Sequence, residues 1–391
     1  MTKIEPPANE PLTMRILISY HYFQDVNVGA MIRKLQDLSG IEKMDVFADS
    51  GAFTAQSQGV HIELSEYVEW IHKWEEYLTV YLNLDVIGNQ EGTNANQETL
   101  ENKFGVHPVP VFTFQWHGSD YDTLAWQLDK YEYISLGGMV PFMGRPKAVM
   151  PHLIKCFKMA GDRTVFHGLG CTNWTIMNAL PFYSVDSSSW VGGVRYGNLS
   201  VFDEHRGRWK RFQLGKPRSF FGAERLFAQY GYDYKEFVRR DTQKYHDVAA
   251  LQGLSYMAAE RWLRKRHGLI HLPSGTWPKW GAINPKRPHG QVAGETKGKN
   301  ETGAKIYLAN IVDYLYDSAA EQCGKVNAEG TKIYLADTGP NIRLPSAASA
   351  VRRVNEGFKI YLASTTNPDR FQAAAGRVWR YNKGGLDYGL A

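Results

Sequence analysis

The sequence predicts an α/β protein built on a (β/α)8 TIM-type barrel, with a helical and hairpin insertion and a C-terminal appendage of β/α repeats. Short strand-like apolar runs alternate with amphipathic helical stretches from about residue 14 onward, which is typical of parallel β/α architecture. Seven such units favour a closed barrel over a doubly wound sheet, whose Gly-x-Gly-x-x-Gly signature is absent after the first strand. In addition, strands end in Asp followed by small residues, as at the catalytic mouth of such barrels.

The expected elements follow from runs of alternating or continuous apolar residues and from helical periodicity. The strands are expected at 15–20, 45–49, 79–85, 109–114, 133–137, 164–168 and 183–186. The clearest helices are expected at 65–78, 93–104, 120–131 and 146–160. Residues 190–220 are predicted to form a polar hairpin insertion and residues 222–266 to be helical. No run stands out as the eighth strand.

The chain has 391 residues, more than the roughly 250–300 that one core usually holds. We expect a flexible arm at 1–13, the barrel at 14–280, a Gly-, Lys-, Asn- and Pro-rich linker at 281–302 and a separate C-terminal region at 303–391. In that region, Lys-Ile-Tyr-Leu-Ala occurs three times with a period of 27 residues. Fixed periods indicate stacked supersecondary units, which could be purely structural or could bind nucleic acid or a partner.

Charge and cysteine usage narrow the class of protein. The net charge is only +5, but Arg206, Arg208, Lys210 and Arg211 begin an acid-free basic segment interleaved with aromatic residues. Such a segment fits a phosphate-binding surface, although a solvated face would look similar. The three cysteines form no CxxC pair, so we expect neither a zinc site nor disulfides, and no cofactor. The absence of a long apolar stretch and of a signal peptide favours a cytoplasmic protein without membrane contact.

Two carboxylates that converge from different strands suit a double displacement. Asp49 and Asp186 each end a strand, and one would act as nucleophile and the other as acid/base. Asp85 ends the next strand and, when ionised, can only accept hydrogen bonds, which suits reading the N–H groups of a base. The pair Gly137–Gly138 would let the backbone approach a flat heterocycle without a Cβ clash. Aromatic residues such as Phe53 or Trp190 could sandwich the ring.

The order of these motifs resembles the tRNA-guanine transglycosylase superfamily, and most closely its phage and bacterial DNA-guanine transglycosylase branch. The resemblance covers residues 14–220 and rests on four segments: 49–53 (DSGAF), 84–85 (LD), 135–140 (SLGGMV) and 184–187 (SVDS), the last preceded by 167–170 (HGLG). It implies a barrel that replaces guanine by a 7-deazaguanine such as 7-cyano-7-deazaguanine (preQ0), through a covalent glycosyl-enzyme intermediate.

The resemblance also implies a role for each matched residue. Asp186 would be the nucleophile, and Asp49 would act as acid/base on the base. The residues implied in binding the base are Asp85, Ser50, Gly51, Phe53, Gln115, Gly137, Gly138 and Met139. The expected partners are therefore DNA, whose target nucleotide must leave the duplex, and a free 7-deazaguanine base.

The chain departs from this pattern in two places. Ala52 replaces the second glycine of the first motif, and the Cys-x-Cys-x-x-Cys…His zinc site of the tRNA enzymes is missing. The missing zinc site favours DNA over tRNA as the substrate. A tRNA enzyme remains the first alternative, a nucleoside or glycoside hydrolase that uses the same carboxylate pair the second, and a DNA-binding protein on an inactive barrel the third.

Overall fold

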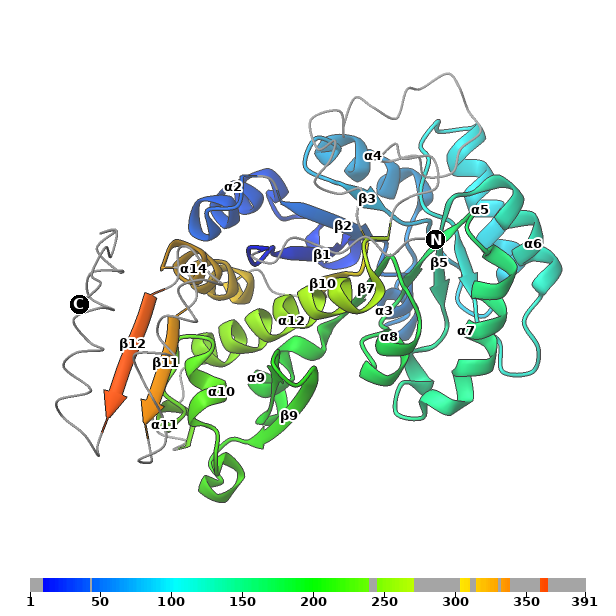
Figure 1. Ribbon diagram of the computed structural model, residues 1–391. Coiled ribbons are helices and arrows are strands. Elements are labelled where there is room, and N and C mark those ends of the chain that lie inside the picture. Colours follow the sequence, from blue (N-terminus) through cyan, green and yellow to red (C-terminus); the bar gives the residue numbers. More distant parts are fainter. Residues whose placement is uncertain are drawn as a thin grey trace, which may run out of the picture.

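The predicted barrel is present in the computed structural model, which describes residues 10–42, 44–238, 245–270, 303–309 and 314–329, and the backbone of 332–337 and 359–364. Eight parallel strands form one sheet with helices around it (Figure 1). The strands are β1 (Arg15–Ser19), β2 (Asp45–Asp49), β3 (Val80–Tyr81), β4 (Val111–Thr113), β5 (Tyr133–Gly137), β6 (Val165–Gly168), β7 (Ser184–Ser187) and β10 (Lys305–Ala309).

The sheet curls until its two ends meet. Its order is β3-β2-β1-β10-β7-β6-β5-β4. The end strands β3 and β4 are joined by a parallel bridge between Leu82 and Val109. There the Val109 N–H donates to the Tyr81 carbonyl (2.9 Å) and the Asn83 N–H to the Val109 carbonyl (3.0 Å). The carboxyl ends of all eight strands therefore open at one mouth, as the fold class predicts.

The helices follow the strands closely. The expected helices correspond to α4 (Leu64–Trp74), α5 (Gln90–Asn102), α6 (Tyr121–Lys130) and α7 (Pro146–Ala160). The other helices of the barrel are α1 (Tyr20–Phe23), α2 (Val28–Ser39), α3 (Ala52–Ser57), α8 (Trp174–Ala179) and α14 (Tyr314–Glu329). The hairpin expected within 190–220 is present as β8 (Asn198–Asp203) paired antiparallel with β9 (Arg208–Gln213).

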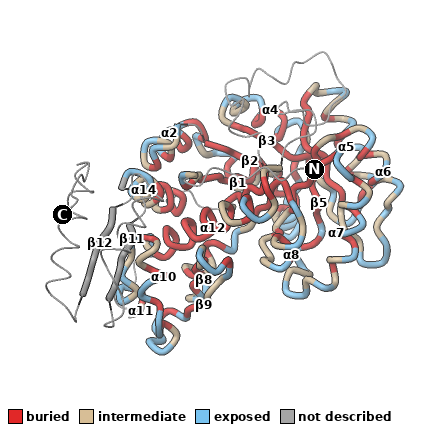
Figure 2. Tube along the Cα trace, viewed as in Figure 1, coloured by how far each residue is buried: buried red, intermediate tan, exposed pale blue. Residues whose placement is uncertain are grey.

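The region expected to be helical after the hairpin contains α10 (Glu224–Ala228), α11 (Lys235–Val238) and α12 (Tyr245–His267). Helix α12 is buried along most of its length (Figure 2). It packs against β8, β10 and α14, so it is enclosed between the barrel and the hairpin. This explains its nearly continuous run of small and apolar residues in place of a single apolar stripe.

The eighth strand is the main correction to the sequence-based domain boundaries. Strand β10 is the first Lys-Ile-Tyr-Leu-Ala repeat, and it lies between β1 and β7. The barrel therefore does not end at residue 280, and residues 303–329 belong to it, not to an appendage. The expected linker at 281–302 lies outside the described residues. The second and third repeats, β11 (Lys332–Asp337) and β12 (Lys359–Ser364), pair with each other in parallel and in register.

Buried polar groups fix β10 in its place. Lys305 is fully buried, and its ammonium lies 3.2 Å from Asp45 Oδ2 on β2. The Tyr307 hydroxyl donates to Asp45 Oδ1 (2.9 Å), and the Ile306 N–H donates to Glu260 Oε2 on α12 (2.9 Å). A slip of one residue would turn Lys305 and Tyr307 away from Asp45. The register of the closing strand is thus specified by hydrogen bonds as well as by apolar packing.

Part of the expected N-terminal arm is also held in place. Glu10 lies 2.9 Å from Arg264 of α12, and the Leu12 N–H donates to Asn327 Oδ1 of α14 (3.1 Å). Leu12 is buried. Residues 10–13 are therefore not a free arm, because they bind the helices that flank β10; residues 1–9 lie outside the described residues. Within the described residues, no helix is long and apolar enough to cross a membrane.

Candidate active site at the barrel mouth

Three carboxylates predicted from sequence lie at the carboxyl ends of their strands. Asp49 is the last residue of β2, Asp85 follows β3, and Asp186 lies in β7. Burial first, and then the charges of Asp85 and Asp186, raise the pKa of Asp49 from 3.8 to about 7. The Asp49 carboxyl group is thus close enough to Asp85 and to Asp186 for their charges to act on it. At neutral pH, Asp49 is poised to take up or release a proton, as an acid/base group requires.

Asp186 is held by two hydrogen bonds to the same oxygen. Its Oδ1 accepts from the Gly170 N–H (2.8 Å) and contacts His167 Nε2 at 3.2 Å. Its side chain is 11% exposed. The other oxygen, Oδ2, has no hydrogen-bond partner within the described part of the chain. The carboxylate is therefore fixed in orientation and has one oxygen available for attack.

The contacts of His167 determine which group donates and which accepts in a chain of hydrogen bonds that ends at Asp186. Because ionised Asp186 can only accept, His167 Nε2 must carry the proton when the ring is neutral, and Nδ1 is then an acceptor. Ser184 Oγ lies 2.6 Å from Nδ1 and must donate to it. The Tyr133 hydroxyl, 2.5 Å from Ser184 Oγ, donates in turn to the serine. The chain Tyr133–Ser184–His167–Asp186 thus runs from the barrel interior to the nucleophile candidate.

His167 is also fixed by packing. It is fully buried, and its ring stacks on Phe47 of β2 with centroids 4.3 Å apart and planes 24° apart. Tyr307 of β10 contacts the edge of both rings. The sequence analysis quoted His167 only as part of a glycine-bearing motif and assigned no role to it, to Ser184 or to Tyr133. Their only sequence signal is a polar residue within an otherwise apolar strand.

Asp85 is half-buried, and burial raises its pKa from 3.8 to about 6. It lines a cavity of about 360 Å³ between the start of α4 and the segment after β3, within the size range of small-molecule sites. Gln56, His61, Glu63 and Asn96 supply the other polar groups of its lining. Neither Asp49 nor Asp186 lines this cavity. Of the three carboxylates, Asp85 is thus the one that borders this cavity.

The segment after Asp49 has the local structure that its sequence requires. Gly51 has a φ of +79°, and a Cβ there would lie 2.3 Å from Ser19 Oγ, so this position demands glycine. The backbone N–H groups of Ser50 and Gly51 donate to Asp49. Ser50 itself is buried, whereas Phe53 on α3 is 58% exposed. Phe53 is thus free to contact a ligand, and Ser50 and Gly51 shape the turn.

The residues around Gly137 and Gly138 explain why this loop contains glycine. Gly138 has a φ of +74°, and a Cβ there would lie 2.6 Å from the Phe114 carbonyl oxygen. The Gly137 carbonyl accepts from the Phe114 N–H (2.9 Å). Met139 is fully buried, so its side chain belongs to the core and only its backbone could contact a base. Gln115 is half-buried, and its backbone N–H donates to Ser119 Oγ (3.0 Å).

Trp190, expected near the ring of a bound base, is likewise a core residue. It is fully buried, its Nε1 donates to the Ala309 carbonyl (2.8 Å), and it stacks on Tyr316 of α14. The indole therefore joins β10 to α14 and does not face the mouth.

The four basic residues of the hairpin do not form one surface. Alternate residues of a strand point to opposite faces, so Arg208 and Lys210 share the face of buried Phe212, and Arg211 lies on the other. The Lys210 ammonium donates to the carbonyls of residues 221 and 222 (3.2 and 3.3 Å). Arg206 lies 3.7 Å from Asp203. The expected cluster is thus divided, with two of its members already engaged within the hairpin.

Arg211, on the opposite face of β9, acts electrostatically on Tyr256 of α12. Burial raises the pKa of Tyr256 on α12 to about 12, and the charge of Arg211 acts in the opposite sense, which places the two side chains near each other. Tyr256 hydrogen-bonds to Thr172, after β6, and to Ser189, after β7. Arg211 is therefore next to the loops that flank Asp186.

Among the described residues, no group of three or more His, Cys, Asp or Glu side chains could bind a metal ion. Comparisons of the chain with family models, with curated proteins and with solved structures found no match.

Proposed function

We propose that the protein is a base-exchange transglycosylase, which replaces guanine in DNA by a 7-deazaguanine through a covalent glycosyl-aspartate intermediate. The observation that carries the proposal is the electrostatic coupling of Asp49 to both Asp85 and Asp186 at the barrel mouth. A base exchange needs three groups there: a nucleophile, a proton-transfer group and an acceptor that reads the base. The motif order that resembles the transglycosylases supports the same assignment.

In the first half-reaction, Asp186 Oδ2 attacks C1′ of the target nucleotide as the bond from C1′ to the base breaks. The Gly170 N–H and His167 hold the carboxylate in one orientation through Oδ1, which lowers the entropy lost on reaching the attack geometry. Asp49, whose pKa of about 7 leaves it partly protonated at neutral pH, donates a proton to the departing guanine. The electron pair of the broken bond leaves with the base.

In the second half-reaction, the ionised Asp49 removes the proton from the ring nitrogen of the incoming base. That nitrogen attacks C1′, and the bond from C1′ to Asp186 breaks, which restores the carboxylate. Asp85 accepts hydrogen bonds from N–H groups of the base. A hydrolase would differ only in that water takes the place of the incoming base.

The test is to incubate the purified protein with duplex DNA, single-stranded DNA or tRNA together with 7-cyano-7-deazaguanine, and to analyse the nucleosides by mass spectrometry. The proposal expects the modified deoxynucleoside and released guanine in equal amounts. Asp186→Asn should abolish both, because an amide is a poor nucleophile, while the circular dichroism spectrum stays that of the wild type.

Four outcomes would contradict the proposal, in three different ways. Incorporation into tRNA alone would make this a tRNA enzyme. Release of guanine without incorporation would make it a hydrolase. Exchange at the wild-type rate by Asp186→Asn would remove this residue as the nucleophile; a glycosyl adduct trapped on Asp49 would have the same meaning.

A further inference from the structure

A stacked pair of aromatic rings, of which one is exposed, lies in the loops of the barrel mouth and has no role in the chemistry above. Trp116, in the loop after β4, is 60% exposed. It stacks on Phe142, with ring centroids 5.2 Å apart and planes only 8° apart. Phe142 ends η1 (Val140–Phe142), a short 3-10 helix in the loop after β5. Both loops follow carboxyl ends of strands, so both belong to the mouth.

The pair is held rigidly from below. Phe114 contacts the edge of Phe142 at 5.3 Å and also packs on His152 of α7, at 4.8 Å. His152 is buried and hydrogen-bonds to the Tyr121 hydroxyl (3.0 Å). Because Phe142 is parallel to Trp116, it covers one face of the indole. A large, preorganised aromatic face in solvent is a feature of ligand-binding surfaces, since ordering it costs little entropy on binding.

Val140 and Gly170 connect the two rings to Asp186, the nucleophile candidate. Val140, two residues before Phe142, is 50% exposed. Its side chain lies against Gly170, where an added Cβ would be 2.5 Å from Val140 Cγ2. Gly170 in turn donates its N–H to Asp186. An apolar strip thus runs from Asp186 over Val140 to Phe142 and Trp116.

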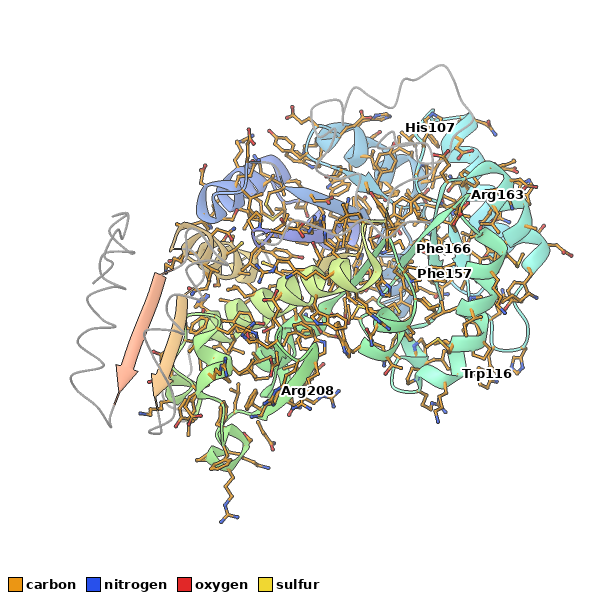
Figure 3. All side chains as sticks on the ribbon, in the orientation of Figure 1. His107, Trp116, Phe157, Arg163, Phe166 and Arg208 are labelled. Carbon is orange, nitrogen blue, oxygen red and sulfur yellow. The ribbon has the colours of Figure 1, made fainter. Side chains whose placement is uncertain are left out.

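Two cations follow η1 closely in the chain. Arg145 and Lys147 are exposed, and no ion pair to either is found within the described residues. The carboxylate of Asp120, four residues after Trp116, is taken up by the N-terminus of α6, where it accepts from the Thr123 hydroxyl (2.6 Å). Trp116 lies on the same side of the molecule as Arg208 of the hairpin, and His107 and Arg163, which precede β4 and β6, lie on the other (Figure 3).

We propose that Trp116 and Phe142 form a stacking platform for an unpaired base next to the nucleotide that reacts at Asp186. This inference rests on the proposed function, and it adds that the substrate strand is unpaired on one side of its target. Stacking on an aromatic face is tolerant of sequence, because every base has a π-face, and nearby cations hold the backbone. Trp116 would thus hold the opened strand without selecting the flanking base.

The test uses Asp186→Asn as the background, so that binding is measured without chemistry. Fluorescence anisotropy gives the affinity for single-stranded oligonucleotides in which an abasic unit is moved through each position beside the target guanine. Trp116→Ala should weaken binding about 5- to 150-fold, the range equivalent to roughly 1–3 kcal/mol of base stacking. Trp116→Phe should keep most of the affinity. The matched control is Tyr245→Ala, which removes an equally exposed aromatic ring (65%) at the start of α12.

The abasic scan distinguishes stacking from a general loss of structure. At one position beside the target, the abasic unit should weaken binding to the protein that retains Trp116 by the same factor as Trp116→Ala does. At that position, the abasic unit should not weaken binding to the Trp116→Ala protein any further. Equal effects of the abasic unit in both proteins at every position would overturn the platform. So would an unchanged affinity of Trp116→Ala.

The result of this binding test can be distinguished from the result of the base-exchange test. Coupling between Trp116 and one base, in a protein that exchanges no base when Asp186 is intact, would support the platform and refute the transglycosylase. Base exchange by Trp116→Ala at the wild-type KM for single-stranded DNA would refute the platform alone.

Discussion

Replacing Asp49 by Asn should stabilise the fold, and this gain should depend on pH. The folded protein raises the pKa of Asp49 from 3.8 to about 7, chiefly by burial and then by the charges of Asp85 and Asp186. At about 1.36 kcal/mol per pKa unit, this shift is equivalent to roughly 4 kcal/mol. Because the side chain is only half-buried, we halve this for solvent screening and expect about 2 kcal/mol.

The sign follows from proton binding in the two states. Between about pH 4 and pH 7 the folded protein holds a proton on Asp49 that the unfolded chain has released. The free energy of unfolding therefore falls as pH rises through this window and stays low above it. An Asn cannot ionise, so Asp49→Asn should match the wild type near pH 4 and exceed it by about 2 kcal/mol at pH 8.

Urea denaturation at pH 4, 5, 6, 7 and 8, followed by tryptophan fluorescence, measures this difference. Asp162→Asn is the matched control, because it makes the same substitution at an exposed position, in the turn after α7. Asp85→Asn should give a smaller gain, since its own pKa is raised only to about 6. A difference between Asp49→Asn and wild type that is constant from pH 4 to pH 8 would refute the burial and coupling of this carboxylate.

Three further outcomes are expected. A chain that ends at residue 302 should aggregate, because it lacks β10 and exposes sheet edges, whereas one that ends at residue 329 should remain monodisperse by size-exclusion chromatography. Ser184→Ala removes the donor to His167 Nδ1 and should slow covalent-intermediate formation about tenfold, as loss of one hydrogen bond of roughly 1–1.5 kcal/mol implies, with a changed pH profile and little change in KM. Arg211→Ala should lower the salt slope of duplex-DNA binding by about 0.9, the value for one phosphate contact; Lys210→Ala should leave it unchanged, because backbone carbonyls already hold that ammonium.

The sequence predicted seven of the eight barrel strands because each is a short apolar run set between helical patterns. It did not predict that β10 is the eighth barrel strand, because Lys-Ile-Tyr-Leu-Ala occurs three times and all three copies are equally good strands. Only tertiary contacts distinguish the first copy: Asp45 receives Lys305 and Tyr307. The period of 27 residues indicated an array of three similar units. In the structure, however, the first repeat is β10, the strand that completes the barrel.

Some residues of the candidate site could be predicted from the sequence and others could not. Asp49, Asp85 and Asp186 could be placed because strand ends are visible in a sequence. His167 and Ser184 could not, because strands covered on both faces show no alternation that marks the barrel interior. The division of Arg208 and Arg211 between two faces of β9 was, by contrast, available from strand periodicity, and a linear count of basic residues obscured it.

The position of β10 has a consequence for how the chain is made. Strands β1 and β7 can be joined only after residue 309 has left the ribosome, although β7 ends at Ser187. At roughly 5–20 residues per second, the interval between Ser187 and Lys305 takes on the order of 6–24 s. During this time two neighbouring strands have unpaired edges, which is a hazard for nascent chains. Helix α12 is synthesised before β10, so its Glu260 is present when the Ile306 N–H that it binds emerges. The order of translation thus makes α12 the surface on which the last strand docks.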